Sequence, residues 1–368
     1  MDLGARLDRI TLPVMVPPTK IQRKRRGESQ GVNACKTIGR PLCGAGRIML
    51  KDQANRATIA LALITVAALF AMGLAAPIRF VYLGSEILIA ILFACSLNLL
   101  MGYGGMLSFG HSAYYALAAY ASGLLMTRWS WSMEAAMVAG PLVAALGAFL
   151  FGMLIVHGHR GEQSTFLMLS LAFSQLVFAI IYKWYDVTRG DDGISGVDAS
   201  GWLADPRHYF VFVLGVVVAC LWLLSRIKAS PFGVTLQSIR DNPQRAEFNG
   251  VSIRRHQLTA FVIAGFFGGI AGSLYAFFSG TISPQIADWT ASARPFLANT
   301  MGGVHSFWGP IFGVLTLETI GTQVGRFTEH SAIAVGLLAI SVGVFLPRGI
   351  VGLAQDLPGW LRRRRGEG

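Results

Sequence analysis

The sequence predicts an all-α fold, a polytopic transmembrane bundle of about eight to ten helices. Of its 368 residues, 53% are hydrophobic and only 14% are charged, a balance that a water-soluble domain of this length does not tolerate. Apolar runs of roughly 20 residues, the length that crosses a bilayer as a helix, recur along the chain. An alternating ten-residue pattern, which would be typical of a membrane barrel, does not occur.

The first element is a basic leader over residues 1–56, which carries twelve Lys or Arg against four acidic residues and has no apolar span. This composition predicts a disordered segment on the cytoplasmic side. A secretory signal is not expected, because the first apolar run begins only near Ala57. We also hypothesise that Met49 is the natural start, which N-terminal sequencing would refute by finding residues before 49.

Residues 57–355 are predicted to form the transmembrane domain, and the basic residues 356–368 a cytoplasmic tail. The predicted spans are 57–76, 81–101, 112–127, 134–156, 165–183, 208–226, 257–278, 292–304, 306–325 and 332–347. The third, eighth and last spans are short, which allows a tilted, broken or re-entrant helix. Such helices are tolerated only where protein or a cavity covers the freed backbone groups.

The orientation follows from the basic residues, which mark cytoplasmic loops. With ten crossings, the leader, the turn at Arg160, the loop 226–256 and the tail all fall on one side, so both termini are expected in the cytoplasm. The segment 184–207 has five aspartates against two arginines and is expected to face outside. Its Asp191 and Asp192 are compatible with a calcium-like pair, but the polar, glycine-rich spacing favours a plain turn.

The sequence contains no catalytic, metal-binding or cofactor-binding pattern. Without GxxxxGK[ST] there is no phosphate-binding loop, so any ATP hydrolysis is expected in a partner protein, and the chain is not expected to be an enzyme. His157 and His159 are the only close histidine pair, and they lack nearby cysteines or carboxylates. The alternative that this chain is a membrane enzyme would be favoured only if His157 and His159 bind a metal ion.

Two acidic residues, Glu86 and Glu318, lie within predicted spans and away from their ends. A charge at such depth is costly and faces the bundle interior or water. They could bind a coupling proton or cation in a secondary transporter. The alternative is that each carboxyl group is hydrogen-bonded or protonated near an interface.

The segment 230–257, "SPFGVTLQSIRDNPQRAEFNGVSIRRHQ", is too long for a simple turn and predicts a pair of short helices. Val234, Leu236 and Ile239 give a partial apolar stripe along the first helix. Asn242, followed by a proline, is a favourable N-cap for the second helix. The pair is therefore expected to lie on the cytoplasmic face.

The second short helix of this pair is expected to end at Gly250, in a left-handed conformation. Arg240, Arg245 and Glu247 are expected to be exposed and to offer charge to a partner protein. The alternative is a helix that lies passively on the lipid surface.

Several stretches occur in an order that resembles one family. They are "SLNLLMGYGGMLSFGHSAYYALAAY" at 96–120, "TFLMLSLAFSQLVFAIIYKWYDVTRGDDGISGV" at 165–197, the 230–257 segment, "MGGVHSFWGPIFG" at 301–313 and "FLPRGIVGL" at 345–353. Together they resemble the branched-chain amino acid ABC transporter permeases, specifically the longer of the two permease subunits. The resemblance covers about residues 57–355, and the leader before 49 has no counterpart in it.

The resemblance implies a permease in the bacterial inner membrane that forms a pore with a second, homologous permease. Two cytoplasmic ATPase subunits would power it, and a periplasmic solute-binding protein would supply the substrate. The segment 229–256 would then contact the ATPases, although "RAEFNG" at 245–250 departs from the strict Glu-Ala-Ala form. The residues expected at that contact are Arg240, Asn242, Arg245, Ala246, Glu247 and Gly250.

The resemblance also implies a translocation path and an outer docking surface. We expect the path to be lined by Asn98, Gly104, Gly105, Ser108 and His111. Tight helix packing is the alternative explanation for the glycines. Asp191 and Asp192 are expected where the solute-binding protein docks. The substrate stays open among branched-chain amino acids, other amino acids, urea and short amides, and an ion-coupled transporter that uses Glu86 and Glu318 is the alternative function.

Overall fold

The computed structural model describes residues 70–71, 73, 76–158, 163–199, 201–324, 336, 349 and 352, all within the compact unit Leu69–Gly368. The predicted leader 1–56, the last predicted span 332–347 and the tail 356–368 lie outside these described ranges, apart from residue 336. Within them the fold is helical, as predicted. Two strands of two residues each, β1 (Ile194–Ser195) and β2 (Thr281–Ile282), form one antiparallel pair.

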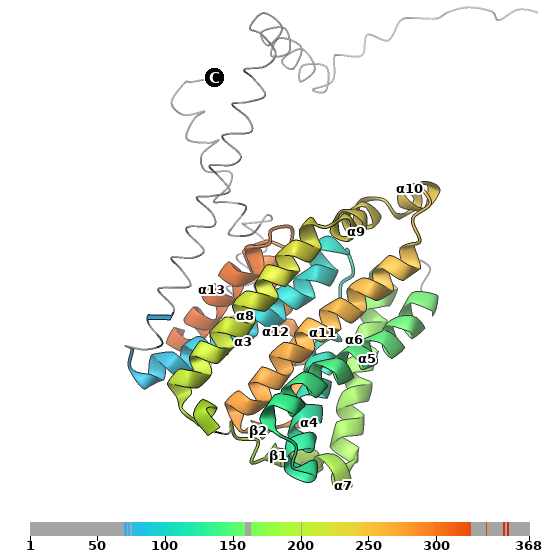
Figure 1. The fold of residues 1–368 in the computed structure, drawn as a ribbon. Helices are drawn as coiled ribbons and strands as arrows, with labels where there is room; N and C mark the ends of the chain where they lie inside the picture. The colour runs from blue at the N-terminus through green and yellow to red at the C-terminus, as the bar shows by residue number, and fades with distance from the viewer. Residues whose placement is uncertain are drawn as a thin grey trace, which may run out of the picture. The chain divides into compact units, whose positions relative to one another are not determined.

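The elements follow one another along the chain, and Figure 1 labels most of them. The helices are α3 (Ile78–Asn98), the π-helix η1 (Leu99–Tyr103), α4 (His111–Trp129), α5 (Met133–Gly158), α6 (Gln163–Lys183), α7 (Tyr185–Thr188), α8 (Pro206–Ala229), α9 (Pro231–Asp241), α10 (Pro243–Phe248), α11 (Ile253–Ser279), α12 (Trp289–Gly302) and α13 (Gly309–Val324), with 3-10 turns η2 (Gly190–Asp192), η3 (Gly201–Ala204) and η4 (Pro284–Ala287).

Five of these helices are long and apolar enough to cross a membrane. They cover Ile78–Tyr103, Met133–Leu154, Thr165–Lys183, Pro206–Ala229 and Ile253–Ser279. Each corresponds to a span predicted from the sequence. The predicted short span 112–127 is a helix of 19 residues, α4, whereas α12 has 14 residues and α13 has 16.

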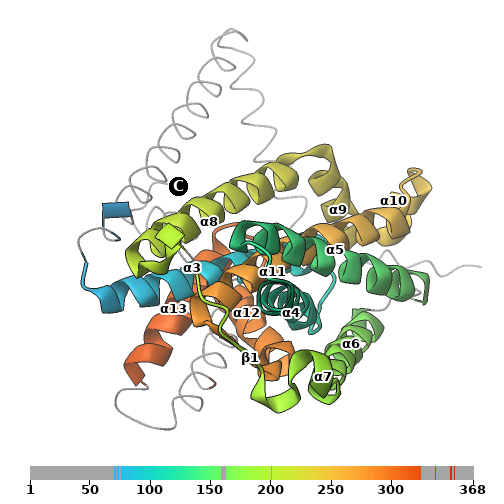
Figure 2. The ribbon, with the colours of Figure 1, turned by 60° about the horizontal axis from the view of Figure 1, so that its bottom comes forward.

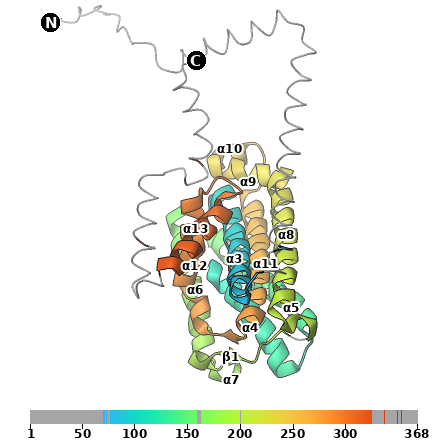
Figure 3. The same ribbon diagram turned by 90° about the vertical axis from the view of Figure 1, so that its left-hand side faces the viewer.

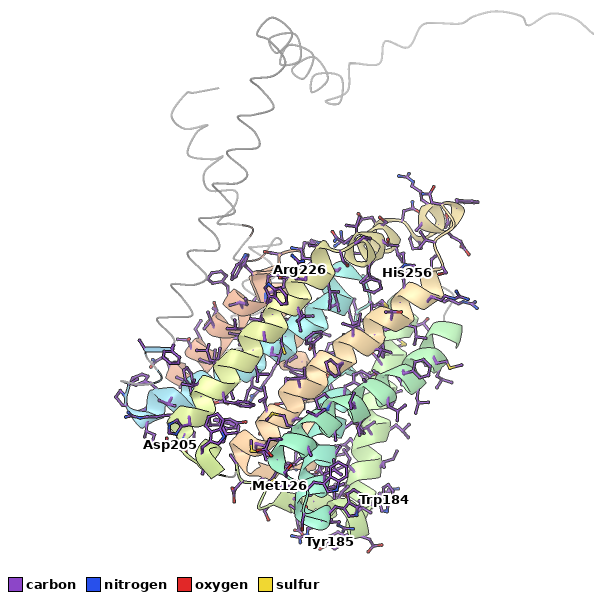
Figure 4. All side chains as sticks on the ribbon, in the orientation of Figure 1. Met126, Trp184, Tyr185, Asp205, Arg226 and His256 are labelled. Atoms are coloured by element: carbon purple, nitrogen blue, oxygen red, sulfur yellow. The ribbon has the colours of Figure 1, made fainter. Side chains whose placement is uncertain are left out.

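The bundle has two chemically different ends. Figures 1 and 3 place α9 and α10 at one end and α7 with β1 at the other. In Figure 4, Arg226 and His256 lie at the α9 end, and Trp184, Tyr185 and Asp205 lie toward the opposite one. In the orientation predicted from the basic residues, the α9 end is the cytoplasmic end and the α7 end is the outer end; this orientation stays a prediction.

Helix α11 lies inside the bundle and packs against α3, α4 and α5 (Figure 2). Its glycines allow this close approach. A Cβ atom at Gly272 would lie 2.1 Å from the carbonyl oxygen of Tyr115, and one at Gly269 would lie 2.6 Å from the Cβ of Ala144. Small residues at such contacts let helix backbones approach closely in a membrane, where van der Waals packing replaces the hydrophobic effect.

Helices α4 and α12 begin inside the bundle, where serines satisfy the free backbone groups. The Ser112 N–H donates to the hydroxyl of Ser292 at 2.8 Å, which joins the first turns of the two helices. The Ser174 hydroxyl donates to the Ala287 carbonyl at 2.7 Å and lies 2.9 Å from the Ser112 hydroxyl. Ser174 is near the middle of α6, so both helices start at mid-span, the tolerated form of a broken helix.

Candidate functional site

A cavity of about 470 Å³ opens between α3, η4, α12 and α13. It is close to the mid-span region where α12 begins. Its lining residues are Glu86, Ile89, Ala90, Phe93, Tyr115, Tyr275, Ser283, Gln285, Ile286, Thr290, Ala291, Arg294, Pro295, Ala298, Val314, Leu317 and Glu318. The volume falls within the range of about 300–1,000 Å³ that small-molecule sites occupy.

The spacing of the lining residues shows which helix faces form the wall of the cavity. Side chains three or four positions apart share one face of a helix. Positions 86, 89, 90 and 93 therefore form one face of α3, while 290, 291, 294 and 298 form one face of α12. The tertiary structure brings these two faces together with 314, 317 and 318 of α13.

Three charged side chains line this cavity: Glu86, Arg294 and Glu318. Glu318 lies close enough to the other two for their charges to interact electrostatically with its own. Sequence reasoning singled out both glutamates, but it did not place them in one cavity and it missed Arg294. The signal that could have identified Arg294 was an arginine inside a predicted span, 292–304, that is otherwise nearly free of charge.

The polar residues predicted to line the path lie in the packed interior. Asn98 Nδ2 donates to the Ser306 carbonyl at 3.4 Å, and the Ser108 hydroxyl accepts from the Gly110 N–H at 3.3 Å. His111 is fully buried, with its Nε2 atom 2.8 Å from the Ser96 hydroxyl. None of the three lines the cavity. Their assignment to the translocation path stays a prediction.

The cavity wall nevertheless connects to this buried group. The ring of Phe93, which lines the cavity, stacks on the imidazole of His111 with 5.2 Å between the ring centroids. His111 therefore lies directly behind the wall. Gly104 and Gly105 lie in the segment between the π-helix η1 and the start of α4. Gly105 adopts φ +68°, a left-handed conformation that glycine adopts readily.

The segment after α8 forms the predicted helix pair, α9 and α10. The Asn242 side chain accepts from the Arg245 N–H at 2.9 Å and caps α10, and Gly250 adopts φ +80° after it. The predicted apolar stripe is partly wrong. Leu236 and Ile239 are buried, but Val234 is 57% exposed. The buried positions 233, 236 and 239 recur every three residues, which leaves 234 on the outer side of α9.

Arg240 corrects the prediction that its side chain is exposed, while its contact with an ATPase subunit stays a prediction. Its guanidinium donates to the Gly102 carbonyl and lies 3.1 Å from Nδ1 of His305. It also pairs with Asp241 at 2.7 Å, and its side chain is only 22% exposed. Arg240 lies four positions after buried Leu236, on the same face of α9, and therefore reaches inward. It ties α9 to η1 and to the turn between α12 and α13, and we call these contacts the Arg240 latch.

The exposed part of the helix pair is its tip, on α10. Arg245 and Glu247 are exposed, as predicted, whereas Ala246 is buried. Phe248 is 91% exposed, and sequence reasoning missed it. An exposed aromatic residue beside exposed charges is typical of a protein contact surface. The roles of Asn242, Gly250 and the other expected contact residues stay predictions.

At the outer end, the two aspartates of the loop have defined partners. Asp192 accepts from the hydroxyl of Tyr185 at 2.9 Å, and this hydrogen bond raises the pKa of Tyr185. Asp191 accepts from the side chain of Gln285 at 3.4 Å. Since Gln285 lines the cavity, the outer loop and the cavity are in contact.

A metal site is not formed by any His, Cys, Asp or Glu group in the described part of the chain. The side chain of His157 and the whole of His159 lie outside that part.

A sequence model of the family "Branched-chain amino acid transport system / permease component" matches residues 79–346. The chain belongs to this family. The match runs from the second residue of α3 past the end of α13, so the bundle is that of a multi-pass membrane permease. The resemblance predicted from the sequence motifs is confirmed.

Several relatives of this permease are themselves described as permeases. The high-affinity branched-chain amino acid transport system permease protein LivM of Escherichia coli is 26% identical over 295 residues, 73% of this chain and 69% of LivM. LivH of Salmonella typhimurium is 22% identical over 282 residues, 71% and 90% of the two chains. The guanosine ABC transporter permease protein NupQ of Bacillus subtilis is 23% identical over 173 residues, 44% and 52% of the two chains.

Among solved structures, PsaBC from Streptococcus pneumoniae in complex with Fab is similar at a TM-score of 0.39 and 15% identity. The similarity covers 75% of this chain and 93% of that one.

Proposed function

We propose that this permease forms half of the translocation pathway of an ATP-driven importer for branched-chain or related amino acids. A second, homologous permease supplies the other half, two cytoplasmic ATPases drive the transport, and a periplasmic solute-binding protein delivers the substrate. The complex lies in the bacterial inner membrane. The family match over residues 79–346 carries this proposal. The relatives named LivM and LivH support a partnership between two permeases of different length.

The geometry of the α9 end supports the coupling to ATPases. Arg245, Glu247 and Phe248 are exposed at the tip of α10 and form the contact surface for an ATPase subunit. Movement of this tip reaches the membrane part through the Arg240 latch, because Arg240 binds Gly102 in η1. The π-helix η1 continues directly from α3, which carries Glu86 in the cavity. Alternating access then needs two arrangements of α3 relative to α12 and α13.

The test is copurification followed by reconstitution. The tagged permease should isolate together with one other permease and two ATPase subunits. In proteoliposomes this complex should take up leucine only with ATP and the solute-binding protein. Isolation without ATPase subunits, or uptake that is independent of ATP, contradicts the proposal.

The clustering of Glu86 and Glu318 in one cavity favours one other candidate function, an ion-coupled secondary transporter. In that case a proton or sodium gradient alone would drive uptake in proteoliposomes. The family match favours the ATP-driven importer, and uptake measured with an ion gradient and no ATP separates the two.

A further inference from the structure

The charges in the cavity between α3, α12 and α13 interact electrostatically, but no direct ion pair joins them in the described part of the chain. Within the described residues, no salt bridge joins Arg294 to Glu86 or Glu318, and no hydrogen bond from these three side chains to another described residue is formed. All three are instead exposed or half-buried along the cavity. A charge in a membrane-spanning bundle without an ion pair or hydrogen bond among the described residues is costly, which makes these side chains candidates for binding a polar ligand.

The remaining wall of the cavity is apolar over part of its surface. Ile89 and Phe93 of α3 lie opposite Val314 and Leu317 of α13. Tyr115 packs on Phe93, with ring centroids 4.6 Å apart, and closes the wall toward α4. The cavity therefore combines one cationic group, two anionic groups and an aliphatic and aromatic surface.

This combination fits a small molecule that carries both charges and an apolar side chain. We infer that the cavity binds a zwitterionic α-amino acid, with Arg294 on its carboxylate, Glu86 and Glu318 on its ammonium group, and the wall of Ile89, Phe93, Val314 and Leu317 around its side chain. The inference rests on the proposed function for the identity of the substrate and adds a binding site within the permease itself. An arginine is suited to a carboxylate because its planar fork donates two parallel hydrogen bonds.

Other ligands leave part of the site unmatched. A free cation would satisfy the two glutamates but would be repelled by Arg294. A nucleoside carries no charge, so its hydroxyl and amide groups can hydrogen-bond to the three side chains but neutralise none of their charges. Discrimination between ligands with one and with two charges is therefore the sharpest test.

The test uses a cysteine placed in the cavity at Ala291, which lines it on α12. The full chain carries A291C, with Cys35 and Cys43 replaced by serine. The native Cys95 and Cys220 are buried. The rate of labelling by a methanethiosulfonate reagent is measured in the purified complex without ligand and with leucine, isoamylamine or 4-methylpentanoate. Leucine carries both charges, isoamylamine carries only the ammonium group, and 4-methylpentanoate carries only the carboxylate.

Leucine is expected to slow the labelling of A291C. At the same concentration, isoamylamine and 4-methylpentanoate are expected to leave the labelling rate unchanged. Adding R294Q should raise the leucine concentration for half-protection by about tenfold or more, the loss of one charge-assisted hydrogen bond. R294K, which keeps the charge, should restore part of the protection. E318Q provides the same test on the ammonium side, in case R294Q does not fold.

R79Q is the matched control for the arginine, since Arg79 lies on α3 but outside the cavity, and E134Q is the control for the glutamates. Equal protection by all three compounds, or none by leucine, overturns the inference. An R294Q variant that leucine protects as well as it protects the unmodified site also overturns the inference. The subunit composition of the same purified sample is measured separately. If the proposed function is wrong, the ATPase subunits are missing from the sample. If the cavity assignment is wrong, the ATPase subunits are present but leucine does not slow the labelling.

Discussion

Breaking the Arg240 latch should uncouple ATP hydrolysis from transport. The R240A substitution removes the bond to the Gly102 carbonyl and the contact with His305, the links from α9 to η1 and to the α12–α13 turn. A hydrogen bond from a charged group contributes about 1.5–3 kcal/mol. Loss of the Gly102 bond alone therefore shifts the balance between latched and unlatched arrangements by about 10- to 150-fold, because 1.4 kcal/mol corresponds to a factor of ten.

The pair of Arg240 with Asp241 contributes little to this estimate. Asp241 is 67% exposed, and an exposed ion pair contributes about 0–1 kcal/mol. D241N should therefore behave like the unmodified chain, and it serves as the matched control. R240K keeps a charge near Gly102 but lacks the fork that reaches both Gly102 and His305, so an intermediate effect is expected.

The assay measures leucine uptake and ATP hydrolysis in the same proteoliposomes. For R240A, uptake per ATP hydrolysed should fall by about tenfold or more, the lower end of the range above. The complex should still assemble, because Arg240 does not lie on the exposed tip of α10. R245A should instead weaken the association with the ATPases. An unchanged ratio of uptake to hydrolysis in R240A, with the complex intact, would refute the role of the latch.

Three further predictions concern packing, and thermal unfolding of the purified permease checks each. G272A should destabilise the bundle by about 1–3 kcal/mol, because its Cβ would meet the Tyr115 carbonyl oxygen at 2.1 Å. The control G215A, where nothing lies within 4 Å of the added Cβ, should be neutral or slightly stabilising. Equal effects of the two substitutions on stability would contradict this account. S292A should cost about 1–3 kcal/mol, since it leaves the buried N–H of residue 112 without its acceptor, and S292T should recover most of the loss. L236D should prevent stable folding of α9 onto the bundle, whereas V234D should be tolerated because that side chain is 57% exposed; similar stability of the two variants would show that α9 packs differently.

The candidate site divides residues that the sequence identified from residues that it did not. Glu86 and Glu318 stood out because acidic side chains inside apolar runs are rare. Their meeting across 232 positions, and the presence of Arg294 between α3 and α13, could not be read from local pattern. Asn98, Ser108 and His111 are buried, and their partners are the Ser306 carbonyl in the α12–α13 turn, the Gly110 N–H in the same loop and the Ser96 hydroxyl of α3. Their place along the translocation path stays a prediction.

The sequence by itself determined the membrane location, the helical class, the boundaries of most spans and the capped helix pair α9–α10. These features depend on apolar run length and on caps such as Asn242, which act over a few residues along the chain. The tertiary structure alone decided which face each polar side chain occupies. It turned Arg240 inward, placed Val234 outward and joined the starts of α4 and α12 through Ser112 and Ser292. The physical reason is that the freed backbone groups of a broken helix need partners, which another helix supplies, and that a charged side chain in a membrane must face the bundle interior or a cavity.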